Sequence, residues 1–257
     1  MATKPPSVLP REHGAYAQMG VALLAALALA PGWRSLAQAV LTAALFFASE
    51  PLLILMGQRG PAVLTACKVL AARRLAVLAC LATLALAGGW VGMPVAFGLA
   101  LVPPAVLGLL LFGLFLAGRE RTAAGEVIAA WAFAAATPAV VLLGGGGPRR
   151  AGLLATLLAC LFTLGTAVVH GHLLALRKAS TGLPRLAAAL LGISLAAGAW
   201  LGRGFLPRSA FATFLPMTLA ALGIWWLPPA PRLLKGVGWT AAFCALAGAA
   251  LAVTALR

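Results

Sequence analysis

Ionisable side chains that could carry out acid–base chemistry are scarce in this chain. Only four residues are acidic, all of them glutamates, and only three are histidines. Glu50 lies well inside a long apolar segment, and Glu126 lies near the start of another. Inside a membrane a carboxylate costs about 3 kcal/mol unless it is paired or hydrated, so it usually has a function. We therefore predict Glu50 and Glu126 as catalytic residues, and we expect Glu50→Gln to abolish activity while leaving insertion and yield intact.

A second set of polar residues stands at the ends of apolar segments and is predicted to bind a substrate. His170 and His172 are two residues apart, which places them about 200° apart around a helix. They cannot both point at one ligand, so we expect one to face the bundle and the other to face the lipid interface. The predicted substrate-binding residues are Arg11, Glu12, His13, Arg59, His170, His172 and Arg177.

The composition is typical of a membrane protein. Hydrophobic residues make up 63% of the chain and charged residues 9%, and the mean hydropathy is +1.05. Soluble domains are about 45–50% apolar and about 25% charged, so a soluble chain of this composition could not cover its own surface. At about 20 residues per span, 257 residues form about eight to ten helices and leave no room for a soluble domain. We predict a single membrane domain over residues 1–257.

Nine apolar segments fit this length, and the predicted fold is an all-α, polytopic bundle of about nine transmembrane helices. Residues 1–13 are predicted as a cytoplasmic N-terminal segment. Residues 61–74 are short and basic, and Pro61 suits a first helical turn, so they are predicted as an interfacial helix. The predicted spans are about 14–30, 36–57, 75–92, 95–117, 123–143, 151–174, 186–201, 210–227 and 237–256.

The positive charge indicates an orientation. The formal net charge is +15, and no basic run is longer than two residues, so we predict no nucleic-acid partner. Thirteen of the 19 Lys and Arg residues fall in the N-terminal segment and the loops on its side, and six fall on the other side. Cytoplasmic loops carry the excess of Lys and Arg. The N-terminus is therefore predicted in the cytoplasm and the C-terminus outside.

On this topology the rare polar residues lie at one depth. Glu12, Glu50, Glu126 and the histidines come at the cytoplasmic ends of the first, second, fifth and sixth spans. We expect these four spans to enclose one cavity that opens to the cytoplasm. A basic rim would attract an anionic headgroup or a phosphorylated substrate. The residues of this rim are Arg11, Arg59, Lys68, Arg73, Arg74, Arg177 and Lys178.

The start of the first span carries a resemblance to a known family. Pro10-Arg11-Glu12-His13-Gly14-Ala15-Tyr16, leading directly into an apolar segment, resembles the N-terminal signature of the YwiC-like family of bacterial membrane proteins. The nine-span profile is similar over nearly the whole chain. The resemblance marks Glu12, His13 and Gly14, and it implies a bacterial inner membrane. It implies no activity, since the family is largely without an assigned function.

A fainter similarity is to the UbiA superfamily of intramembrane prenyltransferases. Those proteins also have nine helices, with polar motifs at the cytoplasmic ends of helices two and six. The matching ends here are Ser49-Glu50-Pro51 and His170-Gly171-His172. The superfamily holds Mg²⁺ against a diphosphate with aspartate-rich motifs, whereas this chain contains no aspartate. The similarity therefore implies a UbiA-like arrangement of helices more than it implies prenyl transfer.

Three functions remain open at this point. The first is a protein that binds or processes a lipid, isoprenoid-type or anionic substrate in the cytoplasm-facing cavity. The alternative is a secondary transporter for a proton- or cation-coupled solute, with Glu50 and Glu126 carrying the ion. The third is redox, with His13 and either His170 or His172 as ligands of haem or a metal. The predicted partners are the lipid bilayer and a lipid or anionic small molecule. Whether the protein is an enzyme, which cofactor it uses and its oligomeric state are left open.

Overall fold

The structure, a computed structural model, describes residues 13–119, 122–177, 182–202 and 204–257. Within these ranges the chain forms nine α-helices and three short 3₁₀ segments, without a strand. The predicted all-α bundle is confirmed. The elements are α1 (His13–Leu29), α2 (Trp33–Leu55), α3 (Pro61–Trp90), η1 (Val95–Leu101), α4 (Val102–Leu116), α5 (Ala123–Leu143), α6 (Pro148–Arg177), α7 (Leu183–Leu201), η2 (Arg208–Phe214), α8 (Leu215–Trp226), η3 (Pro231–Leu233) and α9 (Leu234–Leu256).

The helices have the length and composition of membrane spans. Among the described residues, eight helices are long and apolar enough to cross a bilayer, some of them counted together with the 3₁₀ segment that precedes them. The apolar part of α1, Gly14–Leu29, is shorter, and its length of about 24 Å falls below the roughly 30 Å of a hydrocarbon core. The chain is therefore a multi-pass membrane protein, and its first described helix is apolar but shorter than the eight candidate spans.

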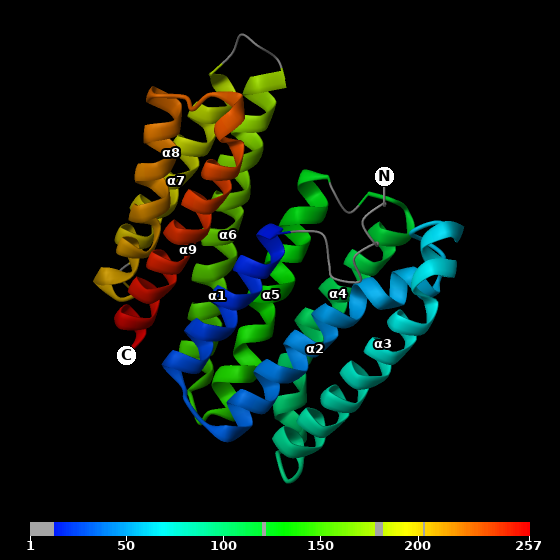
Figure 1. Ribbon diagram of the computed structural model, residues 1–257. Helices are drawn as coiled ribbons and strands as arrows, with labels where there is room; N and C mark the ends of the chain where they lie inside the picture. Colours follow the sequence, from blue (N-terminus) through cyan, green and yellow to red (C-terminus); the bar gives the residue numbers. More distant parts are fainter. Residues whose placement is uncertain (1–12, 120–121, 178–181, 203) are drawn as a thin grey trace.

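Consecutive helices run in opposite directions, so their ends gather at two ends of the bundle (Figure 1). Helices α3, α5, α7 and α9 start at one end of the bundle, and α1 also starts toward this end. We call this end the N-side. The other end, where α9 finishes, is the C-side. In Figure 1 the N-side is at the top, and the start of α1 lies well below the upper ends of α6 and α9. Within the described residues, α1 therefore extends less far toward the N-side than α6 and α9 do.

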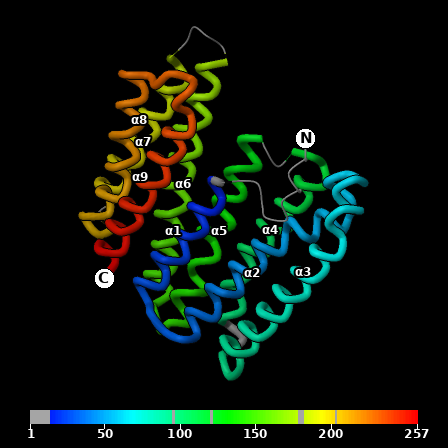
Figure 2. Tube along the Cα trace, in the orientation of Figure 1, coloured from blue at the N-terminus to red at the C-terminus, as the bar shows by residue number. Residues whose placement is uncertain are grey.

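The helices form two groups joined through α1 and α5, as the tube in Figure 2 shows. Helices α6 to α9 pack against one another on one side, and α2 packs along α3 on the other. Helix α5 contacts α4 and α2 on one side and α6 on the other, while α1 contacts both α5 and α9. Helices α1, α5, α6 and α9 are therefore neighbours around a ring.

Helix α3 differs from the predicted division of this region. Residues 61–74 were expected as an interfacial helix and residues 75–92 as a span, but Pro61–Trp90 is one continuous helix of 30 residues. No proline or glycine interrupts it between Pro61 and Gly88, so nothing ends the backbone ladder there. At about 45 Å it is longer than a hydrocarbon core. That its first turns lie in the interface stays a prediction.

Helix α6 carries the centre of the hydrophobic core. Leu154, Leu158 and Leu161 are fully buried along one of its faces, with Phe162 beside them. Helix α4 is the opposite case, because it is apolar throughout and has no buried residue among those described. A helix that is apolar all round and unburied within its own chain is suited to acyl chains. The fold thus places α6 inside and α4 against the lipid.

Candidate functional site

Glu126 and His170 form a hydrogen-bonded pair between α5 and α6, which is an ion pair when the histidine is protonated. Nε2 of His170 lies 2.7 Å from Oε2 of Glu126, so the ring N–H donates to the carboxylate. Thr122 caps α5, its hydroxyl accepting from the N–H of Gly125 at 3.2 Å. The cap places Glu126 in the first turn, where the helix dipole favours a carboxylate. The side chains of Glu126 and His170 are 41% and 21% exposed, so the pair is partly accessible.

A cavity of about 520 Å³ lies beside this pair. Its wall comes from α1, α5, α6 and α9, with Met217 of α8 added. The lining is mostly alanine, glycine and larger apolar side chains, and Glu126, Gln18 and Thr166 supply its polar side-chain groups. Ligand sites of about 300–1,000 Å³ with apolar walls and a few polar groups are typical of small-molecule binding. The cavity therefore has the size and chemistry of a ligand site.

The cavity occupies the N-side half of the bundle. On α6 its lining runs from Val169, next to His170, to Leu161 and Phe162 at the middle of that helix. From Leu161 and Phe162 toward the C-side, α6 continues with Leu154, Leu157 and Leu158, which are all buried and end the cavity there. A ligand in the cavity would thus have its polar contacts near Glu126 and its apolar contacts near the middle of the membrane.

Glu50 forms a second ion pair, with Arg59. Nε of Arg59 donates to Oε1 of Glu50 at 3.0 Å, and Nη2 donates to Oε2 at 2.7 Å. Such two-point contacts between arginine and a carboxylate are strong and fix the geometry of both groups. The Glu50 side chain is 2% exposed and that of Arg59 is 17% exposed. The pair joins the end of α2 to the turn before α3 and buries the carboxylate.

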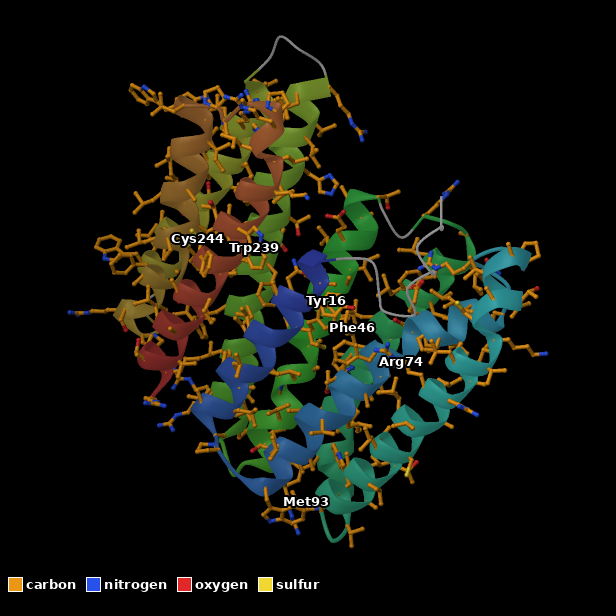
Figure 3. The ribbon with its side chains drawn as sticks, in the orientation of Figure 1. Tyr16, Phe46, Arg74, Met93, Trp239 and Cys244 are labelled. Atoms are coloured by element: carbon orange, nitrogen blue, oxygen red, sulfur yellow. The ribbon has the colours of Figure 1, made fainter. Side chains whose placement is uncertain are left out.

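The first turns of α1 lie between the Glu126–His170 pair and the Glu50–Arg59 pair. Tyr16 packs edge-on against Phe46 of α2, with ring centroids 5.3 Å apart, and Phe46 packs in turn on Phe133 of α5. Figure 3 shows Tyr16 and Phe46 beside each other, with Arg74 of α3 on the α2 side. Tyr16 thus faces the Glu50 region, while its neighbours Ala15 and Gln18 line the cavity.

His172 has a different environment from His170. It is fully buried, and its Nδ1 accepts from Nε of Arg185 at 3.1 Å. An accepting Nδ1 puts the ring proton of a neutral histidine on Nε2, for which the described residues offer no partner. Gly171, between the two histidines, lies so close to α7 that a Cβ there would be 2.7 Å from the Pro184 carbonyl oxygen. The glycine lets α7 approach and bring Arg185 to His172.

The contacts of the described residues join the predicted site residues in separate pairs. The structure brings Glu126 to His170, Glu50 to Arg59 and His172 to Arg185. Among the described residues, the cavity lining comes from α1, α5, α6, α8 and α9, and none of it comes from α2. Arg177 is exposed at the end of α6. Arg11, Glu12 and the His13 side chain lie outside the described residues.

Three polar residues of these sites were not predicted from the sequence. Gln18 and Thr166 line the cavity, and Arg185 holds His172. Gln18 had a usable signal, because it is a lone amide within an apolar helix. Thr166 and Arg185 had none, since threonine is common in membrane helices and Arg185 resembled a loop charge. Within the described ranges no three His, Cys or carboxylate side chains are grouped as metal ligands would be.

Comparison with known proteins gives one match. The model of a family described as "YwiC-like protein" matches residues 9–141, which is 133 of the 257 residues of the chain. The matched part runs from the segment before α1 into α5 and contains Glu50, Arg59 and Glu126. No curated protein matches, and no solved structure does. The match covers more than half of the chain, and the chain belongs to the YwiC-like protein family.

Proposed function

We propose that the protein binds a lipid or isoprenoid-type molecule in the cavity between α1, α5, α6 and α9. One observation carries the proposal: among the described residues of its lining, a largely apolar cavity of about 520 Å³ has one charged side chain, Glu126, which is hydrogen-bonded to His170. An amphipathic molecule has the same division into one polar head and an apolar remainder. Its head would lie at Glu126, and its chain would lie along Ala242, Met217 and Phe162.

The lining favours a head that donates hydrogen bonds. Glu126 is the charged residue among the described residues of the lining, and a carboxylate only accepts. Two of the basic residues predicted to hold an anionic head, Arg59 and Arg177, are not in this lining, since Arg59 binds Glu50 and Arg177 is exposed. A hydroxyl or amine head therefore fits this wall better than a phosphate.

Of the two predicted catalytic glutamates, Glu126 is the better placed. A carboxylate in a cavity wall, hydrogen-bonded to a histidine behind it, can move a proton to or from a bound hydroxyl. Glu126 lines the cavity, and His170 contacts it. Glu50 is buried against Arg59 and belongs, in this proposal, to the support of the α2–α3 turn. Any acid–base chemistry would therefore be carried by Glu126 with His170.

Transport remains the alternative, and the depth of the cavity favours lipid binding over it. A transporter needs polar groups that continue across the membrane. The described lining stops at Leu161 and Phe162, and buried leucines follow on α6 toward the C-side.

The excess of Lys and Arg on the N-side supports placing the mouth of the cavity in the cytoplasm. The proposed site is thus a pocket entered from the cytoplasmic side.

Filling the cavity tests this proposal. Ala242 lines it on α9, and Ala247 of the same helix is exposed. Ala242→Phe should lower the amount of lipid that purifies with the protein by about tenfold, because a clash of about 1–3 kcal/mol opposes binding. Ala247→Phe adds the same side chain outside the cavity and should change nothing. The readout is mass spectrometry of extracted lipid per mole of protein. Equal lipid in all three proteins would contradict the proposal.

A further inference from the structure

A second, smaller cavity lies at the C-side of the molecule, far along α6 from the first. It has a volume of about 310 Å³ and lies between the start of α6, the turn before η2 and the end of α9. Two arginines, Arg149 and Arg150, form one part of its wall. Leu153, Phe205 and Leu256 are among the apolar residues that form the rest. A simple packing defect or an ordinary loop would not be expected to place two adjacent cationic side chains beside an apolar wall.

The charge of these arginines is not offset locally by a described carboxylate side chain. The two glutamates in the described part of the chain, Glu50 and Glu126, both belong to the N-side. Arg149 and Arg150 also stand in the first turn of α6. Cations are disfavoured at a helix N-terminus, whereas an anion there is bound by the free N–H groups and the dipole. An anion in this cavity would therefore be bound by these N–H groups and would reduce the unfavourable charge at the start of α6.

The guanidinium groups are held in place by backbone carbonyls. Nη2 of Arg149 donates to the carbonyl of Phe205 at 3.3 Å, and Nη2 of Arg150 donates to a backbone oxygen of Arg257, the last residue of the chain, at 3.2 Å. Arg257 donates in turn to the carbonyl of Ala28 at 2.9 Å. A guanidinium has five N–H groups, so each arginine keeps further donors for a ligand. The two side chains are thus partly ordered before any ligand arrives.

We propose that this cavity binds the phosphate of an anionic phospholipid. Arginine donors match phosphate oxygens in geometry and charge. The apolar wall and the 80% exposed Phe205 give the acyl chains a surface that a free phosphate would not use. The site lies where α6 begins and α9 ends, which is the headgroup level of a multi-pass protein. It is separate from the Glu126 cavity, so either proposal can fail without the other.

Lipid titration followed by native mass spectrometry tests the site. The protein in detergent is titrated with phosphatidylglycerol, with phosphatidylcholine of the same chains, and with inorganic phosphate. We expect phosphatidylglycerol to bind most tightly, and Arg149→Gln/Arg150→Gln to weaken it by roughly tenfold or more. Arg232→Gln, at an exposed N-side position, should leave this affinity unchanged. Arg149→Lys/Arg150→Lys keeps the charge and should retain most of the binding, which separates loss of the site from misfolding.

Three results would overturn the proposal. The first is equal affinity of the wild-type protein for the two lipids. The second is unchanged phosphatidylglycerol affinity in the double glutamine variant. The third is displacement of the lipid by inorganic phosphate at equal concentration, which would make the site one for free phosphate rather than for a lipid headgroup.

Discussion

Glu50→Ala is expected to lower the free energy of unfolding by about 3 kcal/mol. Removing one partner of a buried ion pair typically costs about 3–5 kcal/mol, because the remaining charge stays in a low-dielectric site. The lower end applies here, since Arg59 keeps 17% of its side chain exposed. The loss should appear as an earlier transition when the purified protein is titrated with denaturing detergent. It should also lower the yield, so we no longer expect Glu50→Gln to leave yield intact.

A double-mutant cycle separates this pair from general damage to α2. Glu50→Gln and Arg59→Gln should each destabilise, and the double variant should be more stable than their sum by about 1–3 kcal/mol. Arg73→Gln removes the same charge from an exposed position of α3 and should have little effect. Strict additivity of the two substitutions would show that the contact between Glu50 and Arg59 contributes nothing to stability.

Glu126→Gln is expected to reduce retention of the bound molecule by roughly tenfold to a hundredfold. A hydrogen bond to a charged group contributes about 1.5–3 kcal/mol, which corresponds to that change in affinity. The amide keeps the size of the side chain but loses the ion pair with His170. Stability should change little, because Glu126 is 41% exposed. The measurement is quantitative mass spectrometry of the lipid species enriched with the wild-type protein.

His170 and Arg177 provide the comparisons for this variant. His170→Gln should cause a similar loss, and combining it with Glu126→Gln should add little, since the two side chains act as one unit. Arg177→Gln should retain the molecule, because Arg177 is exposed and does not belong to the cavity lining. The reverse pattern, with loss in Arg177→Gln and retention in Glu126→Gln, would mean that a basic rim holds an anionic head.

The helices could be predicted from the sequence because each one is a long apolar segment between charged or glycine-rich turns. The prediction failed where charge and helix coincide. Lys68, Arg73 and Arg74 suggested a break before the third span, yet the local sequence there contains only residues that a helix accepts. Long basic side chains can reach the headgroups from a continuous helix. A cluster of charge therefore marks a depth in the membrane rather than the end of a helix.

The pairs within the site depend on which helix faces meet, and only some of them could be foreseen. Glu50 and Arg59 are nine residues apart across one tight turn, so their contact is nearly local. Glu126 and His170 are 44 residues apart, and their contact depends on the rotation of α5 against α6. Gly248 of α9 lies against Thr213 and Leu161, so its lack of a side chain lets the helices pack closely there. Ala245 of the same helix lines the cavity.

The most direct test of the central claim is a cryo-electron microscopy map of the protein purified with its native lipids in nanodiscs. We predict elongated density in the cavity between α1, α5, α6 and α9, with its polar end about 3 Å from the Glu126 carboxylate and its remainder reaching toward Phe162. A map in which this cavity is closed by side chains, or in which lipid lies only on the outer surface of the helices, would contradict the account.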